Sequence, residues 1–355
     1  MTGSSAQTDR VRVVIATPLA PELCARITAV DPRVEVLVDH SLLPPMRHPG
    51  DHSGDPRFHR DRDEQHRFEE LLARADVLYG IPGEDPDALA RAVASNAGLR
   101  WVHTMAAGGG GQVVGARLTP QQHAQVTFTT SAGVHGIPLA EFSVFGILAG
   151  SQDLPRLQRQ QRAHEWPARV LSRPVSGSTV LVIGLGGIGA EVASRCAALG
   201  MRVLGTRRHP EPVPGVDEVH AVEELPDIIG QADHVVVTLP GTAHTANLLG
   251  AKLLSRTKRG VTLVNVGRGT VIDEPALVES LRSGQVGLAV LDVFATEPLP
   301  ADSPLWDLDN VIVSPHSAAL DAREDEQICD LFCENLRAFL DGRPLANAVD
   351  PELGY

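Results

Sequence analysis

Three polar residues stand out because together they could bind an anion and transfer a proton. Arg268 lies in VNVGRGTVIDEPAL, Glu297 in LDVFATEPLP and His316 in VSPHSAA. A guanidinium offers a planar fork of donors to a carboxylate or a carbonyl oxygen. An imidazole titrates near neutrality and can give or take a proton. Taken singly, each residue also has an ordinary interpretation: a surface ion pair, a turn residue before a proline and a buried core histidine.

A glycine motif forms a second chemical feature. Gly184, Gly186 and Gly189 form GLGGIG between a strand-like run, TVLVI, and a helical segment, AEVASRCAALG. In a dinucleotide-binding turn the first glycine allows the tight turn, the second lets the backbone approach the pyrophosphate, and the third allows close packing of helix on strand. The helix N-terminus favours the negative charge. Because strand, turn and helix occur in this order, we expect a dinucleotide site here.

The residues after the next strand indicate which dinucleotide binds. An NAD site has an acidic residue about 20 residues past the glycines, where it accepts hydrogen bonds from ribose hydroxyls. This chain has Arg207 instead, 18 residues after Gly189, with Thr206 before it and Arg208 after it. Two guanidiniums and a hydroxyl suit a ribose 2′-phosphate. We therefore expect NADP(H) as the preferred cofactor, with NAD(H) as the alternative; the competing interpretation is a solvated basic turn.

Two runs of alternating strands and helices must position these residues. The first begins at Arg12 with VRVVIAT and continues through VEVLV, DVLYG and LRWVHT. The second contains TVLVI, RVLG, HVVVTLP, TLVNV, GLAVLDV and VIVSP. This alternation predicts the α/β fold class with parallel sheets, and six strands in the second run match a doubly wound dinucleotide-binding sheet. The helices of the second run are expected at about 190–199, 225–231, 251–256 and 274–283.

Two further helical segments flank this second run. Residues 137–166 have a helical pattern, and Ser176–Ser178 form the turn into the strand TVLVI. A helix from about Leu320 has no strands of its own, so we expect it to return to the first domain.

Composition and charge exclude several classes of protein. The 355 residues are 43% hydrophobic and 21% charged, which is typical of a globular protein. A net charge of -13 argues against general binding to nucleic acids or anionic membranes. The longest apolar runs are far shorter than the ~18 residues of a membrane span. The first ten residues are polar and lack the apolar core of a signal peptide, so we expect a cytoplasmic protein.

The cysteines and histidines do not form a recognisable metal motif. The four cysteines contain no CxxC pair, and we interpret Cys329 and Cys333 as buried small hydrophobes rather than metal ligands. Five histidines lie in an irregular, proline-broken insertion at residues 40–66, which we interpret as a solvated surface loop. We expect no metal. A glycine run, Gly108–Gly111, follows the strand LRWVHT, where it is either a ligand-approaching loop or a flexible connector.

With GLGGIG, the motifs around Arg268, Glu297 and His316 resemble the D-isomer-specific 2-hydroxyacid dehydrogenase family, in particular its NADP-type glyoxylate/hydroxypyruvate reductases. The four motifs occur in the family's order, and the resemblance extends from Arg12 to about Gly342. It implies a Rossmann domain at 132–320, inserted in a flavodoxin-like substrate domain made of 1–131 plus 321–355. It also implies ligands in the cleft between the domains, hydride transfer between nicotinamide and a small 2-oxo acid or D-2-hydroxy acid, and a homodimer.

The resemblance assigns a role to each motif residue. Arg268 holds the carboxylate and carbonyl oxygen of the substrate, His316 is the acid and base, and Glu297 orients His316. Asp292 contacts the nicotinamide amide, although a strand-end cap is the alternative. The expected substrate-binding residues are Ala106, Ala107, Gly108, Gly109, Arg268 and His316. The expected cofactor-binding residues are Gly184, Gly186, Gly187, Ile188, Gly189, Thr206, Arg207, Arg208, Leu239, Pro240, Val266 and Asp292.

This chain departs from the family pattern at the substrate loop. Most relatives carry a bulkier residue, often an aspartate, after the first glycine, whereas this chain continues in glycine, which leaves pocket shape and substrate size open. Glu297 argues against a formate dehydrogenase, which carries glutamine at that position. Oxidation of phosphite, and a nucleotide-sensing role like that of corepressors on the same fold, stay open as alternatives.

Overall fold

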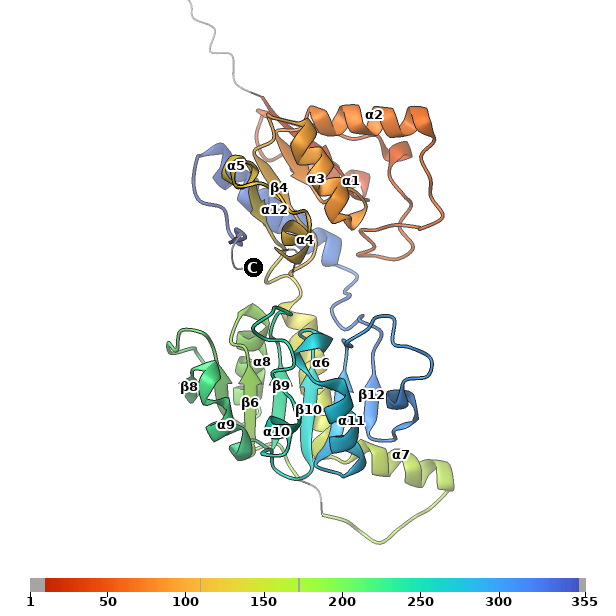
Figure 1. Cartoon of the computed structure of the whole chain (residues 1–355), viewed down its shortest axis with the longest axis vertical. Helices are drawn as coiled ribbons and strands as arrows, with labels where there is room; N and C mark the ends of the chain where they lie inside the picture. The colour runs from red at the N-terminus through yellow and green to blue at the C-terminus, as the bar shows by residue number, and fades with distance from the viewer. Residues whose placement is uncertain (1–9, 109, 172, 351–355) are drawn as a thin grey trace, which may run out of the picture. The chain divides into compact units, whose positions relative to one another are not determined.

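The computed structural model describes residues 10–108, 110–171 and 173–350. These residues form two compact units (Figure 1). The first contains the described residues up to Val134 together with those from Leu320 onward, and the second is His135–Ala319. The chain therefore leaves the first unit once and returns to it, and each unit has its own hydrophobic core.

The first unit is built on a five-stranded parallel sheet. Its strand order is β2-β1-β3-β4-β5, the order of flavodoxin-like folds. The strands are β1 (Val11–Ile15), β2 (Val34–Leu37), β3 (Val77–Tyr79), β4 (Trp101–His103) and β5 (Thr127–Thr129). Its helices are α1 (Pro21–Thr28), α2 (Arg62–Ala73), α3 (Pro86–Ser95), α4 (Gly110–Gly115), α5 (Pro120–Gln125) and α12 (Glu324–Leu340), with short 3-10 turns at His40–Leu42 and Pro82–Glu84.

Helix α12 returns to the first unit because its apolar stripe completes that core. Ile328, Phe332 and Leu336 recur at helical spacing and are fully buried. The Phe332 ring stacks on Trp101 of β4 with 4.7 Å between ring centroids. The C-terminal helix thus covers the sheet formed by the N-terminal strands.

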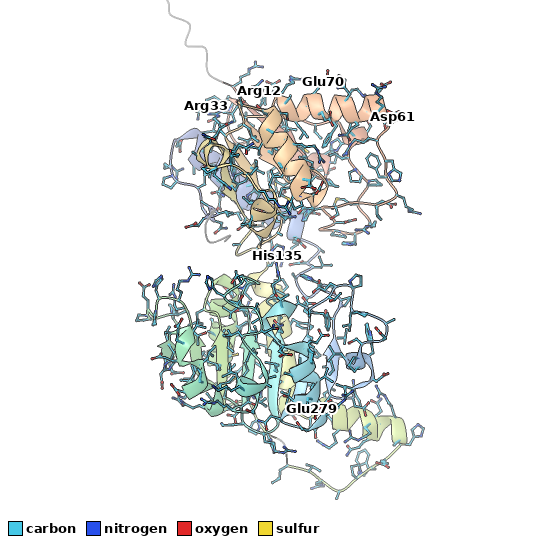
Figure 2. All side chains as sticks on the ribbon, in the orientation of Figure 1. Arg12, Arg33, Asp61, Glu70, His135 and Glu279 are labelled. Atoms are coloured by element: carbon cyan, nitrogen blue, oxygen red, sulfur yellow. The ribbon has the colours of Figure 1, made fainter. Side chains whose placement is uncertain are left out.

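The insertion at residues 40–66 lies largely at the surface, as interpreted from the sequence, but a few of its residues anchor it to the first unit. Leu42 and Leu43 are buried in the first core. The Arg60 guanidinium lies 3.9 Å from the centre of the Phe68 ring and donates to the Leu42 carbonyl oxygen. Asp61, labelled in Figure 2, caps the N-terminus of α2 through a capping box. His66, the last histidine of the insertion, lies within this helix.

The second unit contains a seven-stranded parallel sheet, and the expected α/β fold with a Rossmann-type domain is confirmed. Its order, β12-β11-β10-β9-β6-β7-β8, is the doubly wound order with one strand added. The strands are β6 (Thr179–Ile183), β7 (Arg202–Thr206), β8 (Glu218–His220), β9 (His234–Val237), β10 (Val261–Asn265), β11 (Val286–Leu291) and β12 (Val311–Val313). Six of them were expected. The edge strand β8 was not, because it has three residues and two are polar.

Helices cover both faces of this sheet. They are α6 (Gly136–Ser151), α7 (Leu154–Ala163), α8 (Gly187–Ala198), α9 (Leu225–Ile228), α10 (Ala251–Leu254) and α11 (Glu274–Arg282), with 3-10 turns at Val222–Glu224, Ile229–Gln231, Gly269–Val271 and Pro304–Asp307. The segment expected to be helical over 137–166 breaks at Asp153, which has φ +52° and caps α7. Among the described residues no helix is long and apolar enough to cross a membrane.

Candidate active site

The expected site residues of the second unit gather at one edge of its sheet. The glycine turn follows β6, Thr206 ends β7, and Leu239 and Pro240 come after β9. Arg268 follows β10, Asp292 follows β11 and His316 follows β12. Because all seven strands are parallel, their carboxyl ends meet at the same edge. Since β10, β11 and β12 are successive neighbours, Arg268 and His316 lie on the same side of this unit.

The glycine turn has the geometry that a pyrophosphate requires. Gly184 has φ +108°, a conformation that favours glycine, and Thr238 Oγ1 donates to its carbonyl oxygen at 2.5 Å. A Cβ on Gly189 would overlap that same oxygen, so α8 can pack this closely only with glycine here. No atom lies within 4 Å of the position that a Cβ would take on Gly186 or Gly187, so the space in front of both residues is open. Helix α8 begins at Gly187, and Ile188, the next residue, is partly exposed.

The residues after β7 are only partly as expected. Thr206 is fully buried, and its Oγ1 has no hydrogen-bond partner within the described residues. Its hydroxyl is therefore not accessible to a ligand in this conformation, because the strand turns that side chain inward. The Arg207 backbone N–H donates to the His220 carbonyl oxygen at 3.1 Å. The Arg207 guanidinium is partly exposed and lies 4.0 Å from the Glu211 carboxylate. Arg208 is exposed. The accessible donors here are the two arginines.

Arg268 lies on a tight loop that a buried asparagine organises. Asn265 Oδ1 accepts from the Gly267 N–H at 3.1 Å, and its Nδ2 donates to the Arg268 carbonyl oxygen at 3.1 Å. Val266, within this loop, is buried. The Arg268 side chain is exposed, and its Nη1 donates to the Gly267 carbonyl oxygen at 2.8 Å. The guanidinium can therefore exchange a contact within its own loop for an anion.

Glu297 and His316 form a directed pair. His316 Nδ1 lies 2.7 Å from Glu297 Oε2, while Oε1 of the same carboxylate accepts from the Phe294 N–H at 3.0 Å. Both carboxylate oxygens are thus engaged, which fixes the orientation of the imidazole. The His316 side chain is 47% exposed, so its Nε2 is left for a ligand. The Phe294 backbone also packs directly against Gly269, which follows Arg268, so the pair is joined to the arginine loop.

Asp292 holds the turn that carries His316. It is buried, and its Oδ1 accepts from Ser314 Oγ at 2.5 Å and from the N–H groups of Ser317 and Ala318 at 2.9 and 3.0 Å. The strand-end cap that the sequence left as the alternative is therefore present. A contact with nicotinamide stays a prediction for this residue.

The expected substrate loop belongs to the first unit. It follows β4, with Ala106 and Ala107 partly exposed and Gly108 exposed, while Gly109 lies outside the described residues. Gly110 and Gly111 are not a connector, because they begin α4.

Sequence reasoning missed three residues that build this site. They are Thr238, which braces the glycine turn, and Ser314 and Ser317, which bind Asp292 on either side of His316. The only sequence signal for these residues was their place within the motifs HVVVTLP and VSPHSAA. Leu239 and Pro240 lie where expected, next to Gly241, whose Cβ position is 3.3 Å from the Arg268 Cβ.

Comparison with known proteins gives consistent results. The family model for the D-isomer specific 2-hydroxyacid dehydrogenase, NAD binding domain, matches residues 144–318. A D-3-phosphoglycerate dehydrogenase of Mycobacterium leprae is 38% identical over 216 residues, which cover 61% of this chain and 41% of that protein. The chain thus spans less than half the length of that curated relative.

Two solved structures match nearly the whole chain. A D-isomer specific 2-hydroxyacid dehydrogenase from Xanthobacter autotrophicus Py2, in complex with NADPH and MES, is 31% identical with a TM-score of 0.76, over 98% of this chain and 100% of that one. An NADPH-dependent glyoxylate/hydroxypyruvate reductase from Sinorhizobium meliloti, in complex with NADP and sulfate, is 28% identical with a TM-score of 0.75, again over 98% and 100%.

Proposed function

Because the chain belongs to the D-isomer specific 2-hydroxyacid dehydrogenase family, we propose that it is an oxidoreductase that transfers a hydride between NADP(H) and a small 2-oxo acid or D-2-hydroxy acid. The observation that supports this most is the 2.7 Å contact between His316 and Glu297. It lies on the strand edge that also carries Arg268 and the glycine turn.

The residues of the second unit fit a nicotinamide dinucleotide. The open space in front of Gly186 and Gly187 leaves room for a pyrophosphate at the start of α8. Leu239, Pro240 and Val266 flank the same strand edge as further cofactor-binding residues. When bound, the reduced nicotinamide supplies the hydride.

Three side chains would carry the rest of the chemistry. The Arg268 guanidinium binds the substrate carboxylate and carbonyl oxygen, which fixes the keto carbon and stabilises charge that develops on its oxygen. His316 Nε2, the ring nitrogen that Glu297 does not engage, donates a proton to that oxygen, and in the oxidative direction it takes the hydroxyl proton. The Glu297 carboxylate balances the imidazolium and prevents the ring from turning.

NADP(H) is the preferred cofactor in this proposal. Arg207 and Arg208 replace the acidic residue that would bind ribose hydroxyls, and their guanidiniums can bind a 2′-phosphate. NADPH and NADP are present in the two related structures described above.

The proposed substrates are unbranched 2-oxo acids such as glyoxylate and hydroxypyruvate. The basis is the reductase activity named for the Sinorhizobium meliloti relative, together with a loop, Ala106–Gly108, that carries no bulky side chain. Backbone N–H groups of this loop are proposed to bind the substrate carboxylate.

A homodimer is also part of the proposal. Ile137, Phe145 and Leu148 of α6 are 45, 45 and 40% exposed, although they are large and apolar. After α7 the chain continues as an apolar segment, 165–171, in which Trp166, Val170 and Leu171 are 100, 61 and 95% exposed. Figure 1 shows α7 and this segment extending away from the strands of the seven-stranded sheet.

The proposal is tested by following NADPH absorbance after adding glyoxylate, hydroxypyruvate or a larger 2-oxo acid. We expect consumption of NADPH with at least one small 2-oxo acid, and slower turnover with NADH. Tight NADPH binding without turnover on any acid in the panel would instead indicate a nucleotide-sensing protein.

A further inference from the structure

His103, the last residue of β4, is a buried titratable group that the proposed reaction does not use. It is fully buried, and aromatic rings surround it: Phe332, Trp101 and Tyr79 have centroids 5.6, 6.2 and 6.3 Å from the imidazole. Burial lowers the pKa of His103 to about 3. At neutral pH the ring is therefore uncharged and carries one N–H.

Hydrogen bonds on both sides of the ring determine where that N–H is. Ser131 Oγ donates its one hydrogen to the Thr104 carbonyl oxygen at 3.0 Å. The same Oγ lies 3.2 Å from His103 Nε2, so it must accept there, and Nε2 carries the hydrogen. A neutral ring then has a bare Nδ1, which accepts from Thr129 Oγ1 at 2.8 Å.

The network continues to Trp101 and is complete. The Trp101 indole N–H, which can only donate, lies 2.8 Å from Thr129 Oγ1. Thr129 therefore accepts from Trp101 and donates to His103. The order of donation is from Trp101 to Thr129 to His103 and then to Ser131 and the Thr104 carbonyl oxygen, with each polar group satisfied. Buried networks of this kind favour a single arrangement.

The network ends where the substrate loop begins. Thr104 donates its backbone N–H to the Thr129 carbonyl oxygen at 2.8 Å, so both its N–H and its C=O are fixed. Met105, the next residue, is 1% exposed, and the exposed part of the loop starts at Ala106. A shift of the Thr104 backbone would therefore also shift the backbone N–H groups of the substrate loop, Ala106–Gly108.

Ser131 is itself fixed from both sides. Thr130 donates its backbone N–H to the Asn347 carbonyl oxygen at 3.0 Å, and Asn347 Nδ2 donates to the Ala132 carbonyl oxygen at 2.7 Å. The serine is thus anchored to the C-terminal segment, independently of the loop. Ser131 connects this anchored point to the start of the loop through the Thr104 carbonyl oxygen, and His103 holds the Ser131 hydroxyl in the orientation that this bond requires.

We propose that His103 is a positioning residue, held as the neutral Nε2–H tautomer, that fixes the substrate loop through Ser131 and the Thr104 carbonyl oxygen. The inference rests on the proposed function for the loop's role in substrate binding. The hydrogen bonds of His103 and its tautomer do not depend on the proposed function.

The tautomer is tested by nitrogen-15 NMR of the histidine side chains in the full chain, with His103→Gln identifying the signal. We expect a protonated Nε2 and a bare Nδ1 that do not change between about pH 5 and about pH 8. A protonated Nδ1, or a titration within that range, would overturn the inference.

Positioning is tested with Ser131→Ala, which removes a single hydroxyl. We expect KM for the 2-oxo acid to rise about tenfold, with the dissociation constant of NADPH changed less than about twofold. Amide exchange at residues 105–108 should become faster. Ser143→Ala removes an equally buried serine hydroxyl in α6 and should leave KM and the exchange of this loop unchanged.

Substitutions of His103 itself give a second comparison. Glutamine can donate to Ser131 and accept from Thr129, whereas leucine can do neither. His103→Gln should therefore keep KM closer to the wild-type value than His103→Leu. Unchanged KM and loop exchange in Ser131→Ala, or equal KM in both His103 variants, would contradict the positioning role. If the wild type reduces no 2-oxo acid, the proposed function fails, but the tautomer and loop exchange still test the network.

Discussion

The His316 N–H donates to the Asp292 carbonyl oxygen at 3.0 Å, and this bond joins the end of β12 to the end of β11. His316 has φ +52°, a left-handed conformation that is unfavourable for a histidine. The Asp292 carboxylate binds Ser314 before it and the Ser317 and Ala318 N–H groups after it. Asp292 therefore fixes the backbone of the proposed acid, while Glu297 fixes its ring.

Asp292→Ala should lower both stability and turnover. It removes a buried carboxylate oxygen that accepts three hydrogen bonds, so we expect a loss of about 2–4 kcal/mol in the free energy of unfolding. We expect kcat/KM to fall more than about 100-fold. Ser314→Ala removes one of the three bonds and should give a smaller loss of the same kind, measured by denaturant unfolding and steady-state kinetics. Full activity of Asp292→Ala would show that the turn forms without it.

Arg207→Asp should change the choice of cofactor. It removes a guanidinium proposed to bind the 2′-phosphate and introduces a carboxylate that repels it and can accept from ribose hydroxyls. We expect NADPH affinity to fall at least about tenfold relative to NADH, measured by fluorescence titration of both nucleotides. Arg202→Asp, at the opposite end of β7, is the control and should not change this ratio. Equal losses for NADPH and NADH in Arg207→Asp would show that Arg207 does not contact the 2′-phosphate.

The buried His103 should make the protein less stable in acid. Its folded pKa of about 3 lies below the value near 6.5 expected for an unfolded histidine, so the unfolded chain binds the proton first as pH falls. The contribution is complete above about pH 6.5 and is lost towards about pH 3, with a slope of about 1.4 kcal/mol per pH unit.

His103→Gln should flatten this acid dependence in denaturant unfolding experiments at several pH values. His234, whose pKa burial lowers to about 4, is present in both proteins and cancels from the comparison. Parallel stability curves would mean that His103 does not titrate as a buried neutral group.

Leu171→Asp combined with Trp166→Asp should weaken self-association. Both side chains are almost fully exposed and apolar, and charges there would oppose burial against a second copy. We expect the wild type to have the mass of two chains by light scattering, and the double variant to shift towards one. Leu199→Asp, on an exposed apolar residue outside this segment, is the control. A wild-type mass equal to one chain contradicts the dimer.

The parallel strands and the glycine turn could be predicted because their signals are local. Apolar runs such as Thr179–Ile183 and Val261–Asn265 form strands, and Gly184 and Gly189 occur where a turn demands glycine. Once the strands are parallel, their carboxyl ends lie at one edge, which places Arg268 and His316 at the same edge of the sheet.

The remaining features depend on contacts that spacing does not reveal. The Thr206 side chain points into the core because of the face of β7 on which it lies. The surface insertion is anchored to α2 because the Arg60 guanidinium lies over the Phe68 ring. The hydrogen bonds of Asp292 come from residues that reach it only when β12 pairs with β11. Such partners are defined by tertiary structure.

Deuterium transfer tests the central claim most directly. NADPH deuterated at both C4 positions is incubated with a small 2-oxo acid and the wild type, His316→Ala or Glu297→Gln, and the product is analysed by mass spectrometry and NMR. We predict deuterium at C2 of a 2-hydroxy acid for the wild type. His316→Ala should bind NADPH but form no such product, and Glu297→Gln should form it about 100- to 10,000-fold more slowly. A wild-type product without deuterium at C2, or an undiminished rate in His316→Ala, would contradict the account.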